Sequence, residues 1–379
     1  MSRLARSPLQ ALAGMCVHQL LTRPIPDDAP AFVARKGMLR LAMRAARRAL
    51  QLQWSGQRPT LRTRFDPHWQ RVLWIHEGMP QIGDALMDLA PRSLLVEHGL
   101  QVDLFAAKHI ATLFEHDAWF VRALHRHVDV RIENYDAVIV LSHDRKALAL
   151  KQTRLAALPW VSLQGFYGGP DFHRARFATQ RLADLLDLTL APEAFARHSA
   201  QKLQVTAKAA QQAALDCPAT DRICLVLGGV WPARTFHRWP ELIAALHARG
   251  LRRFMLLGGA NGRQLADQLI SGAGADVELL DFVGRTTLPG AHALLARSAA
   301  VVCADGGLMH LALTGPAPVI AMFNAEIDPS WRLPIQMNGV GFKSPDREVD
   351  GLLPDLVADA VSGAVRFASQ RAAAPIAGG

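Results

Sequence analysis

The sequence predicts an α/β protein with two Rossmann-like halves, and three observations support that prediction. The chain has 379 residues, which is more than one ordinary domain and fits two domains of roughly 150 residues. Short apolar runs rich in β-branched residues alternate with segments of helical periodicity, as in parallel sheets covered by helices. This alternation starts twice, at residues 71–76 and 222–227. Because small-molecule sites favour domain interfaces, we expect the functional site in a cleft between the halves.

These patterns divide the chain into four expected segments. Residues 1–65 form a basic N-terminal extension, and residues 66–200 form the first Rossmann-like domain. Residues 218–348 form the second Rossmann-like domain, and residues 349–379 form a C-terminal helix and tail.

The extension carries the positive charge of the protein. Residues 1–65 have a net charge of +10, whereas the remainder has a net charge of −1. A nucleic-acid enzyme usually spreads basic surface over its working domain, so this distribution argues against a nucleic-acid partner. The pattern over residues 32–53 predicts one helix with a basic side and a largely apolar side. The basic side consists of Lys36, Arg40, Arg44, Arg47 and Arg48, and the other side consists of Leu39, Ala42, Met43, Ala46, Leu50 and Gln53. Such a helix binds an anionic membrane surface or packs against the body as a solvated helix, and both interpretations stay open.

Composition excludes several other classes of protein. No apolar run reaches the roughly 18–20 residues that a membrane-spanning helix needs, and the N-terminus lacks the pattern of a signal peptide. The four cysteines form no C-x-x-C pair, which favours reduced, buried thiols in a cytoplasmic protein. His125 and His127 lack further ligands at metal-binding spacing, so we expect no metal site.

The first half begins with a strand at residues 71–76 and a turn that contains Gly83 and Asp84. A helix is expected from residue 85 to residue 98, with Gly99 at its end. The remaining elements expected in this half are strands at 102–105, 128–132, 137–141 and 160–163 and a helix at 174–190.

The second half repeats the alternation after a charged, alanine-rich connection at residues 191–220. Its expected strands lie at 222–227, 254–257, 277–280, 300–304 and 318–323, and its expected helices at 240–249, 262–270, 289–298, 308–314 and 352–370.

The most informative stretch follows the strand at residues 300–304. Asp305 ends the strand, and Gly306 and Gly307 form the turn before a helix that starts at Leu308. Glycines let the backbone approach a ligand closely, and the free N–H groups at a helix start favour negative charge. The pattern predicts a cradle for a diphosphate, with a plain strand-to-helix turn as the alternative.

Four fragments, taken together, resemble glycosyltransferase family 9, the bacterial heptosyltransferases that build the inner core of lipopolysaccharide. They are Ile82-Gly83-Asp84, the segment from Trp231 to Trp239-Pro240, the turn Gly284-Arg285-Thr286 and the segment from Asp305 to His310. The resemblance covers about residues 70–345 and leaves the extension outside.

The resemblance implies a GT-B architecture, in which an N-terminal domain binds the acceptor and a C-terminal domain binds a nucleotide-activated sugar. It also implies inverting transfer without a metal ion or other cofactor. The implied donor is ADP-heptose, and the implied acceptor is a lipid-linked or envelope glycan at the inner face of the cytoplasmic membrane.

Transfer from a sugar nucleotide needs a base for the acceptor hydroxyl, and positive charge or N–H donors for the leaving diphosphate. Asp84 matches the proposed base of the family, and a helix N-cap is its other interpretation. Asp305 orients the sugar or fixes the loop, and His310 faces the cleft or packs the helix start. The donor-binding residues that the resemblance implies are Arg234, His237, Arg238, Arg285, Thr286, Asp305, Gly306, Gly307, Leu308 and His310.

This chain departs from the family pattern in four places. His237-Arg238 stands where a lysine usually precedes Trp-Pro, and Gly307 replaces a serine or threonine. The strand at 222–227 ends in Gly228-Gly229 instead of H-P-G-A, and residues 323–326 read F-N-A-E instead of F-G-P-T. These changes leave the sugar, the nucleotide and the acceptor open. The alternatives are a non-catalytic sugar-nucleotide-binding relative, a sugar-nucleotide epimerase and a glycosyltransferase that modifies protein.

Overall fold

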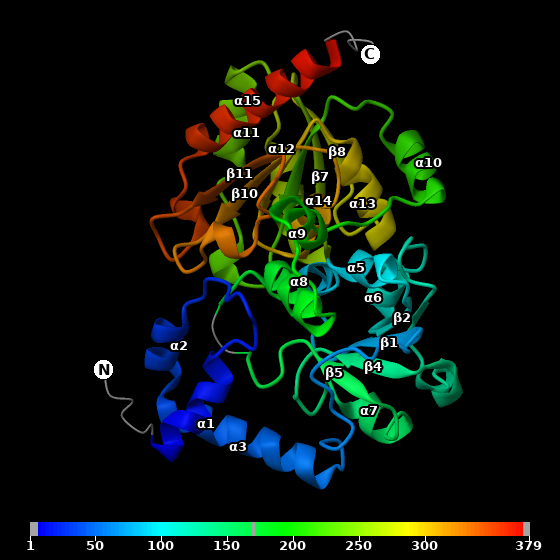
Figure 1. Cartoon of the computed structure of the whole chain (residues 1–379). Coiled ribbons are helices and arrows are strands. Elements are labelled where there is room, and N and C mark those ends of the chain that lie inside the picture. Colours follow the sequence, from blue (N-terminus) through cyan, green and yellow to red (C-terminus); the bar gives the residue numbers. More distant parts are fainter. Residues whose placement is uncertain (1–6, 169–170, 374–379) are drawn as a thin grey trace. The chain divides into compact units, whose positions relative to one another are not determined.

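The structure is a computed structural model that describes residues 7–168 and 171–373 (Figure 1). The chain forms two compact units, residues 1–201 and residues 202–379. Residues 1–6 of the expected extension and residues 374–379 of the expected tail lie outside the described residues.

The first unit contains a parallel sheet of five strands in the order β3-β2-β1-β4-β5. The strands are β1 (Arg71–His76), β2 (Gln101–Ala106), β3 (Arg122–Leu124), β4 (Ala137–Val140) and β5 (Trp160–Ser162). β1 lies between β2 and β4, so the connections leave it in opposite directions. The switch point of this sheet is therefore at the carboxyl ends of β1 and β4, the place where parallel α/β sheets generally bind ligands.

Short helices surround this sheet. They are α4 (Ile82–Asp88), α5 (Arg92–Glu97), α6 (Lys108–Leu113), α7 (Ala149–Arg154), α8 (Arg174–Leu185) and α9 (Pro192–Ser199), with 3-10 turns η1 (His127–Asp129) and η2 (Ile132–Asn134). The side chains of Trp74, on β1, and Trp160, on β5, are completely buried.

Three N-terminal helices pack onto the same unit: α1 (Pro8–Val17), α2 (Ala29–Lys36) and α3 (Met38–Trp54). Cys16, Phe32 and Leu41 lie in a small core between them, whereas Leu52 of α3 joins the core of the sheet. The single helix expected over residues 32–53 is wrong, because Gly37 takes a left-handed φ of 79° that ends α2 before α3 begins.

The second unit contains a parallel sheet of six strands in the order β11-β10-β9-β6-β7-β8. The strands are β6 (Ile223–Leu227), β7 (Arg253–Gly258), β8 (Glu278–Asp281), β9 (Ala300–Ala304), β10 (Val319–Phe323) and β11 (Gly339–Lys343). β6 lies between β7 and β9, so the switch point of this sheet is at the carboxyl ends of β6 and β9.

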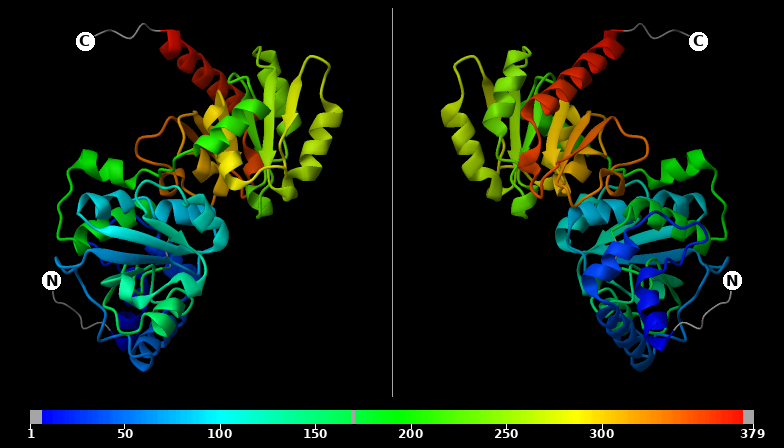
Figure 2. Two further views of the ribbon diagram at one scale, coloured as in Figure 1. Left: turned by 90° about the vertical axis from the view of Figure 1, so that its right-hand side faces the viewer. Right: turned by 90° about the vertical axis from the view of Figure 1, so that its left-hand side faces the viewer.

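The helices of the second unit form two groups. α11 (Trp239–Ala248) packs with α12 (Arg263–Gly272) and with α15 (Pro354–Ala373), which is drawn in red in Figures 1 and 2. α13 (Leu288–Arg297) packs with α10 (Ala207–Asp216) and α14 (Gly307–Ala312). The 3-10 turns are η3 (Pro232–Arg234), η4 (Ala260–Gly262), η5 (Pro329–Trp331) and η6 (Val349–Gly351).

Three further expectations about the elements are wrong. The helix expected over residues 85–98 is interrupted, because Pro91 begins a new helix as the N-cap of α5. The strand expected over residues 128–132 is not one: η1 and η2 occupy this region, and β3 is the strand that pairs with β2. The helix expected over residues 174–190 ends at Leu185, since Asp187 has a left-handed φ of 60°.

Two composition-based expectations can be compared with the described residues. All four cysteines are buried and unpaired, as expected. No helix in the described ranges is both long and apolar enough to cross a bilayer.

Candidate functional site

Asp84 lies at the carboxyl edge of the first sheet, as the third residue of α4. The N-cap of α4 is Gln81, so the N-cap interpretation of Asp84 is wrong. The Asp84 side chain is 24% exposed, and its Oδ1 atom lies 3.5 Å from Nε of Arg174 on α8. A carboxylate in the first turn of a helix is also favoured by the helix dipole. Asp84 is therefore a solvent-accessible carboxylate beside a largely buried cation.

Arg174 belongs to a buried ionic network beneath Asp84. Its Nε donates to Oδ1 of Asp88 at 3.0 Å and its Nη2 donates to Oδ2, while Nε2 of His76 lies 3.2 Å from Asp88 Oδ2. Burial alone would lower the pKa of Arg174, but Asp84 and Asp88 raise it. Burial alone would raise the pKa of Asp88, but Arg174 and His76 lower it. Both groups therefore stay charged, and Arg174 holds Asp84 in place.

The sequence reasoning missed His76, Asp88 and Arg174. Asp88 lies four residues after Asp84, on the same face of α4, and that spacing is a signal that could have found it. Arg174 starts a helix far along the chain, and nothing near it in sequence links it to Asp84.

Asp305 is the central residue of the candidate donor site in the second unit. It follows β9, and its side chain is only 3% exposed. Nη1 of Arg234, from the turn η3 after β6, lies 3.0 Å from its Oδ2 atom. Nε of Arg332 and Nε2 of His310 each lie 4.0 Å from the Asp305 carboxylate. These residues meet at the switch point between β6 and β9.

Arg332 follows the turn η5 and was missing from the sequence-based candidates. His310 is buried within α14, beside Asp305. The Asp305 carboxylate keeps two guanidinium groups close together, and such a pair of cations can bind an anionic ligand.

The glycine turn after Asp305 is built from extended backbone. Gly306 has φ 175°, and Gly307 is the first residue of α14, which ends at Ala312. Neither glycine has a left-handed φ, so the turn does not require glycine for that reason. Leu308 follows within the first turn of α14.

His237 and Arg238 are bound within their own unit. The backbone N–H of His237 donates to Asp350 at 2.7 Å, and its Nδ1 lies 2.8 Å from the same carboxylate. Arg238 donates to the carbonyl oxygen of Leu352 at 3.3 Å and pairs with Glu241 at 3.4 Å. The contacts of His237 and Arg238 attach the start of α11 to residues 350–352 and so stabilise the fold of the second unit.

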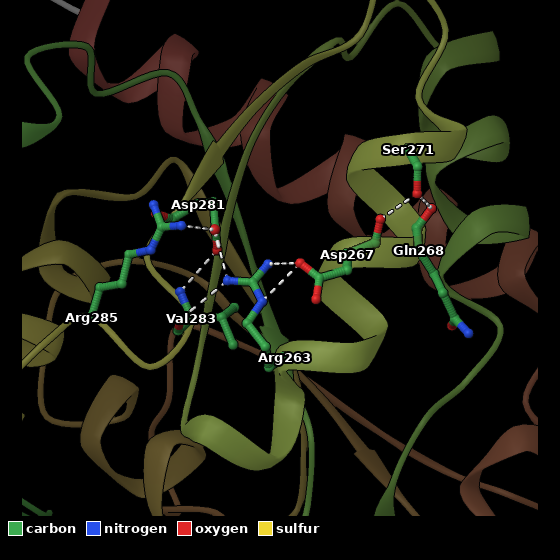
Figure 3. Close-up of polar contacts among 7 residues, drawn as sticks. All are labelled: Arg263, Asp267, Gln268, Ser271, Asp281, Val283 and Arg285. Atoms are coloured by element: carbon green, nitrogen blue, oxygen red, sulfur yellow. Dashed lines mark hydrogen bonds and ion pairs between the residues drawn. The ribbon is translucent and has the colours of Figure 1, made fainter.

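Arg285 lies after β8, at the edge of the sheet. Figure 3 shows that it shares Asp281 with Arg263, at 3.1 and 2.7 Å respectively. Thr286 has no hydrogen bond within the described part of the chain, whereas Thr287 caps α13 by accepting from the N–H of Gly290 at 3.3 Å. The structure therefore brings Arg234 and Asp305 together but leaves Arg285 engaged elsewhere. Among the described residues, no group of three or more His, Cys, Asp or Glu side chains is arranged to hold a metal ion.

Two parallel α/β units, each with candidate residues at its switch point, are the architecture of GT-B glycosyltransferases. A glycosyltransferase family 9 structure from Veillonella parvula superposes with a TM-score of 0.66 at 13% identity, covering 80% of this chain and 98% of that one. The E. coli ADP-heptose lps heptosyltransferase II superposes with a TM-score of 0.59 at 17% identity, covering 79% of this chain and 100% of that one. The E. coli heptosyltransferase WaaC with ADP superposes with a TM-score of 0.58 at 20% identity, covering 78% of this chain and 100% of that one. The predicted α/β, GT-B fold is confirmed.

The sequence also matches a family model. Residues 172–349 match the model of glycosyltransferase family 9 (heptosyltransferase), which confirms the resemblance; three of the four fragments lie in this range, and Ile82-Gly83-Asp84 lies outside it. This match covers somewhat less than half of the chain and supports glycosyltransferase activity. A search of curated proteins finds no match.

Proposed function

We propose that this enzyme transfers a heptose from ADP-heptose to a lipopolysaccharide core or a related envelope glycan, with inversion and without a metal ion. The observation that carries the proposal is Asp84, an accessible carboxylate held 3.5 Å from Arg174 at the carboxyl edge of the first sheet. The nature of the donor is supported by the fold shared with structures described as heptosyltransferases, one of them solved with ADP.

In the proposed reaction, Asp84 accepts the proton of the acceptor hydroxyl while that oxygen attacks the anomeric carbon. The bond from the anomeric carbon to the diphosphate oxygen breaks on the opposite face, which inverts the configuration. Arg174 positions Asp84 through the network with Asp88. Arg234 and Arg332 stabilise the negative charge that develops on the diphosphate, together with the backbone N–H groups of Gly306 and Gly307.

A direct assay tests the proposal against its alternatives. The purified protein is incubated with ADP-heptose, with and without a core oligosaccharide, and ADP release and product mass are measured. Release of ADP together with a heptosylated oligosaccharide is expected. A sugar-nucleotide-binding relative would show donor binding without ADP release, an epimerase would convert the donor without acceptor, and a protein-modifying transferase would add mass to protein. A thermal-shift screen of sugar nucleotides identifies the donor if ADP-heptose is wrong, because a ligand that binds the native state raises its stability.

We further propose that α3 attaches the enzyme to the inner face of the cytoplasmic membrane. One face of α3 exposes large apolar side chains, namely Leu39 (60%), Met43 (56%), Leu50 (48%) and Trp54 (80%). These residues fall on one stripe of the helix, and Arg40 and Arg47 flank it. An apolar stripe beside arginines is the pattern of a helix that lies in an anionic membrane interface.

A further inference from the structure

A cavity of about 280 Å³ lies in the first unit between α3 and the loop that follows β4. We call it the arginine cavity, and it is lined by Met43, Arg44, Arg47, Arg48, Gln51, Asp144 and Arg145. Four guanidinium groups therefore surround one small space that contains a single carboxylate.

Arg48 is the fixed member of the four arginines. Its side chain is buried, and Nη1 donates to the carbonyl oxygen of Phe166 at 3.0 Å. Its Nη2 donates to Oδ2 of Asp144 at 3.2 Å, while Oδ1 of Asp144 accepts from the backbone N–H of Lys146 at 3.1 Å. The only acid of the cavity is therefore already used by Arg48 and by its own loop.

The other three arginines have no such close partner. The side chains of Arg44, Arg47 and Arg145 form no hydrogen bond or ion pair within the described ranges, 7–168 and 171–373. Partial desolvation, and then the positive charge of Arg48, lower the pKa of Arg44, and the charge of Asp144 offsets this shift only in part. Holding like charges together in this way costs free energy unless an anion is bound between them.

The arginine cavity lies at the functional edge of the first unit. Asp144 and Arg145 follow β4, whose carboxyl end borders the switch point next to β1. The loop after β1 also touches this region, since a Cβ atom at Gly78 would lie 3.2 Å from Cβ of Lys146. α4, which carries Asp84, follows that same loop.

We propose that the arginine cavity binds a phosphate group carried by the acceptor. Guanidinium groups bind phosphate through paired, charge-assisted hydrogen bonds. The volume is at the lower limit of ligand pockets, which fits one charged group and part of its sugar. The assignment of this phosphate to the acceptor rests on the proposed function, whereas the phosphate chemistry of the cavity does not.

Arginine-specific labelling with phenylglyoxal, mapped by peptide mass spectrometry, tests the cavity directly. The full-length protein is labelled alone, with glucose 6-phosphate, with phosphatidylglycerol vesicles and with phosphatidylcholine vesicles. Glucose 6-phosphate is expected to slow the labelling of Arg44, Arg47 and Arg145, but not that of the exposed Arg154 on α7. Protection only by phosphatidylglycerol would overturn the acceptor as the source and assign the phosphate to a lipid headgroup. Labelling that neither phosphate source slows would overturn the site.

A double variant separates this inference from the proposed function. Arg44→Gln with Arg47→Gln should weaken glucose 6-phosphate binding by roughly tenfold or more, because charge-assisted hydrogen bonds are lost. Arg154→Gln is the matched control and should bind as the wild type does. In the transfer assay, the double variant should raise KM for a phosphorylated acceptor and leave KM for the donor unchanged. An enzyme without heptosyl transfer but with phosphate protection at Arg44 would contradict the proposed function and retain the site. Unchanged phosphate binding in the folded double variant would contradict the site.

Discussion

In the first unit, we expect catalysis to depend most strongly on the contact between Asp84 and Arg174. The carboxylate reaches solvent, and Arg174 is held from below by Asp88. One side of the arrangement is therefore available to substrate and the other is fixed. The two residues should respond differently to substitution.

Asp84→Asn should lower turnover by about 10²- to 10⁴-fold, the usual effect of losing a general base. Donor affinity and melting temperature should change little, because the amide preserves the shape of the side chain. Steady-state transfer and calorimetry with ADP check these expectations, with the exposed Glu115→Gln as the control. Wild-type turnover in Asp84→Asn would exclude the base role.

Arg174→Met should reduce the free energy of unfolding by about 3–5 kcal/mol, since it leaves the buried Asp88 carboxylate without its cation. Urea denaturation measures the effect. Adding Asp88→Asn should recover part of the loss, because the uncompensated charge is then removed. A double variant that is as unstable as the sum of both single changes would show that the pair does not act as an ionic unit.

Arg234→Gln should weaken ADP binding by roughly tenfold, the scale of one charge-assisted hydrogen bond. Arg285→Gln should weaken it less, since Arg285 is paired with Asp281 at the edge of the sheet. Calorimetry with ADP on both variants makes the comparison. A larger loss in Arg285→Gln would place the diphosphate site at the loop after β8 and not at the switch point between β6 and β9. Gly307→Val should weaken ADP binding through the bulk of the valine side chain and not through backbone strain, because Gly307 has no left-handed φ.

At the scale of the element, α3 has a different character on each side. Leu41, Ala45 and Leu52 are buried, whereas the opposite stripe exposes Leu39, Leu50 and Trp54. Gln57, just after the helix, accepts a hydrogen bond from Lys151 and through its carbonyl from Trp160. Deleting the extension would therefore damage the first unit, so its role is better tested with single residues on the exposed side.

Leu50→Glu with Trp54→Glu should abolish sedimentation with phosphatidylglycerol vesicles and leave activity on a soluble acceptor unchanged. The change removes apolar area and adds negative charge opposite an anionic surface. Raising the salt concentration should release the wild type as well, since screening shortens electrostatic attraction. If the wild-type protein does not sediment with these vesicles at low salt, membrane binding by α3 is excluded and α3 serves only to pack against the first unit.

At the scale of the whole molecule, each unit has its own sheet and its own core. All donor-binding candidates lie in residues 202–379, whereas Asp84 and the arginine cavity lie in residues 1–201. Under the proposed function, donor binding and acceptor binding are thus separated along the chain.

Residues 202–379 produced alone should therefore bind ADP with an affinity close to that of the full chain and show no transfer. Calorimetry and the transfer assay measure the two properties, and circular dichroism shows whether the fragment is folded. Arg234→Gln in the same fragment serves as the control for specific binding. A folded fragment that does not bind ADP would mean that the first unit supplies donor contacts.

The sequence by itself determined the features that depend on neighbours along the chain. Short continuous apolar runs predicted the buried strands β1, β6 and β9, because such a run is a local property of the sequence. The same holds for the turn at Asp305-Gly306-Gly307 and for the position of Asp84 after β1. β11 was missed, since it is a partly exposed edge strand whose glycines at 339 and 341 carry no strand signal.

Only the tertiary structure decided which charges meet. Arg174 reaches Asp84, Arg234 reaches Asp305, and Arg48 reaches Asp144, and in each case the partners come from different elements. The structure also engaged His237 and Arg285 with acids that the motif did not include. An ion pair depends on distance in space, and the sheet order and loop paths set that distance. No local sequence pattern encodes the sheet order or the loop paths. The charged residues could therefore be identified from the sequence, but their partners could not be predicted.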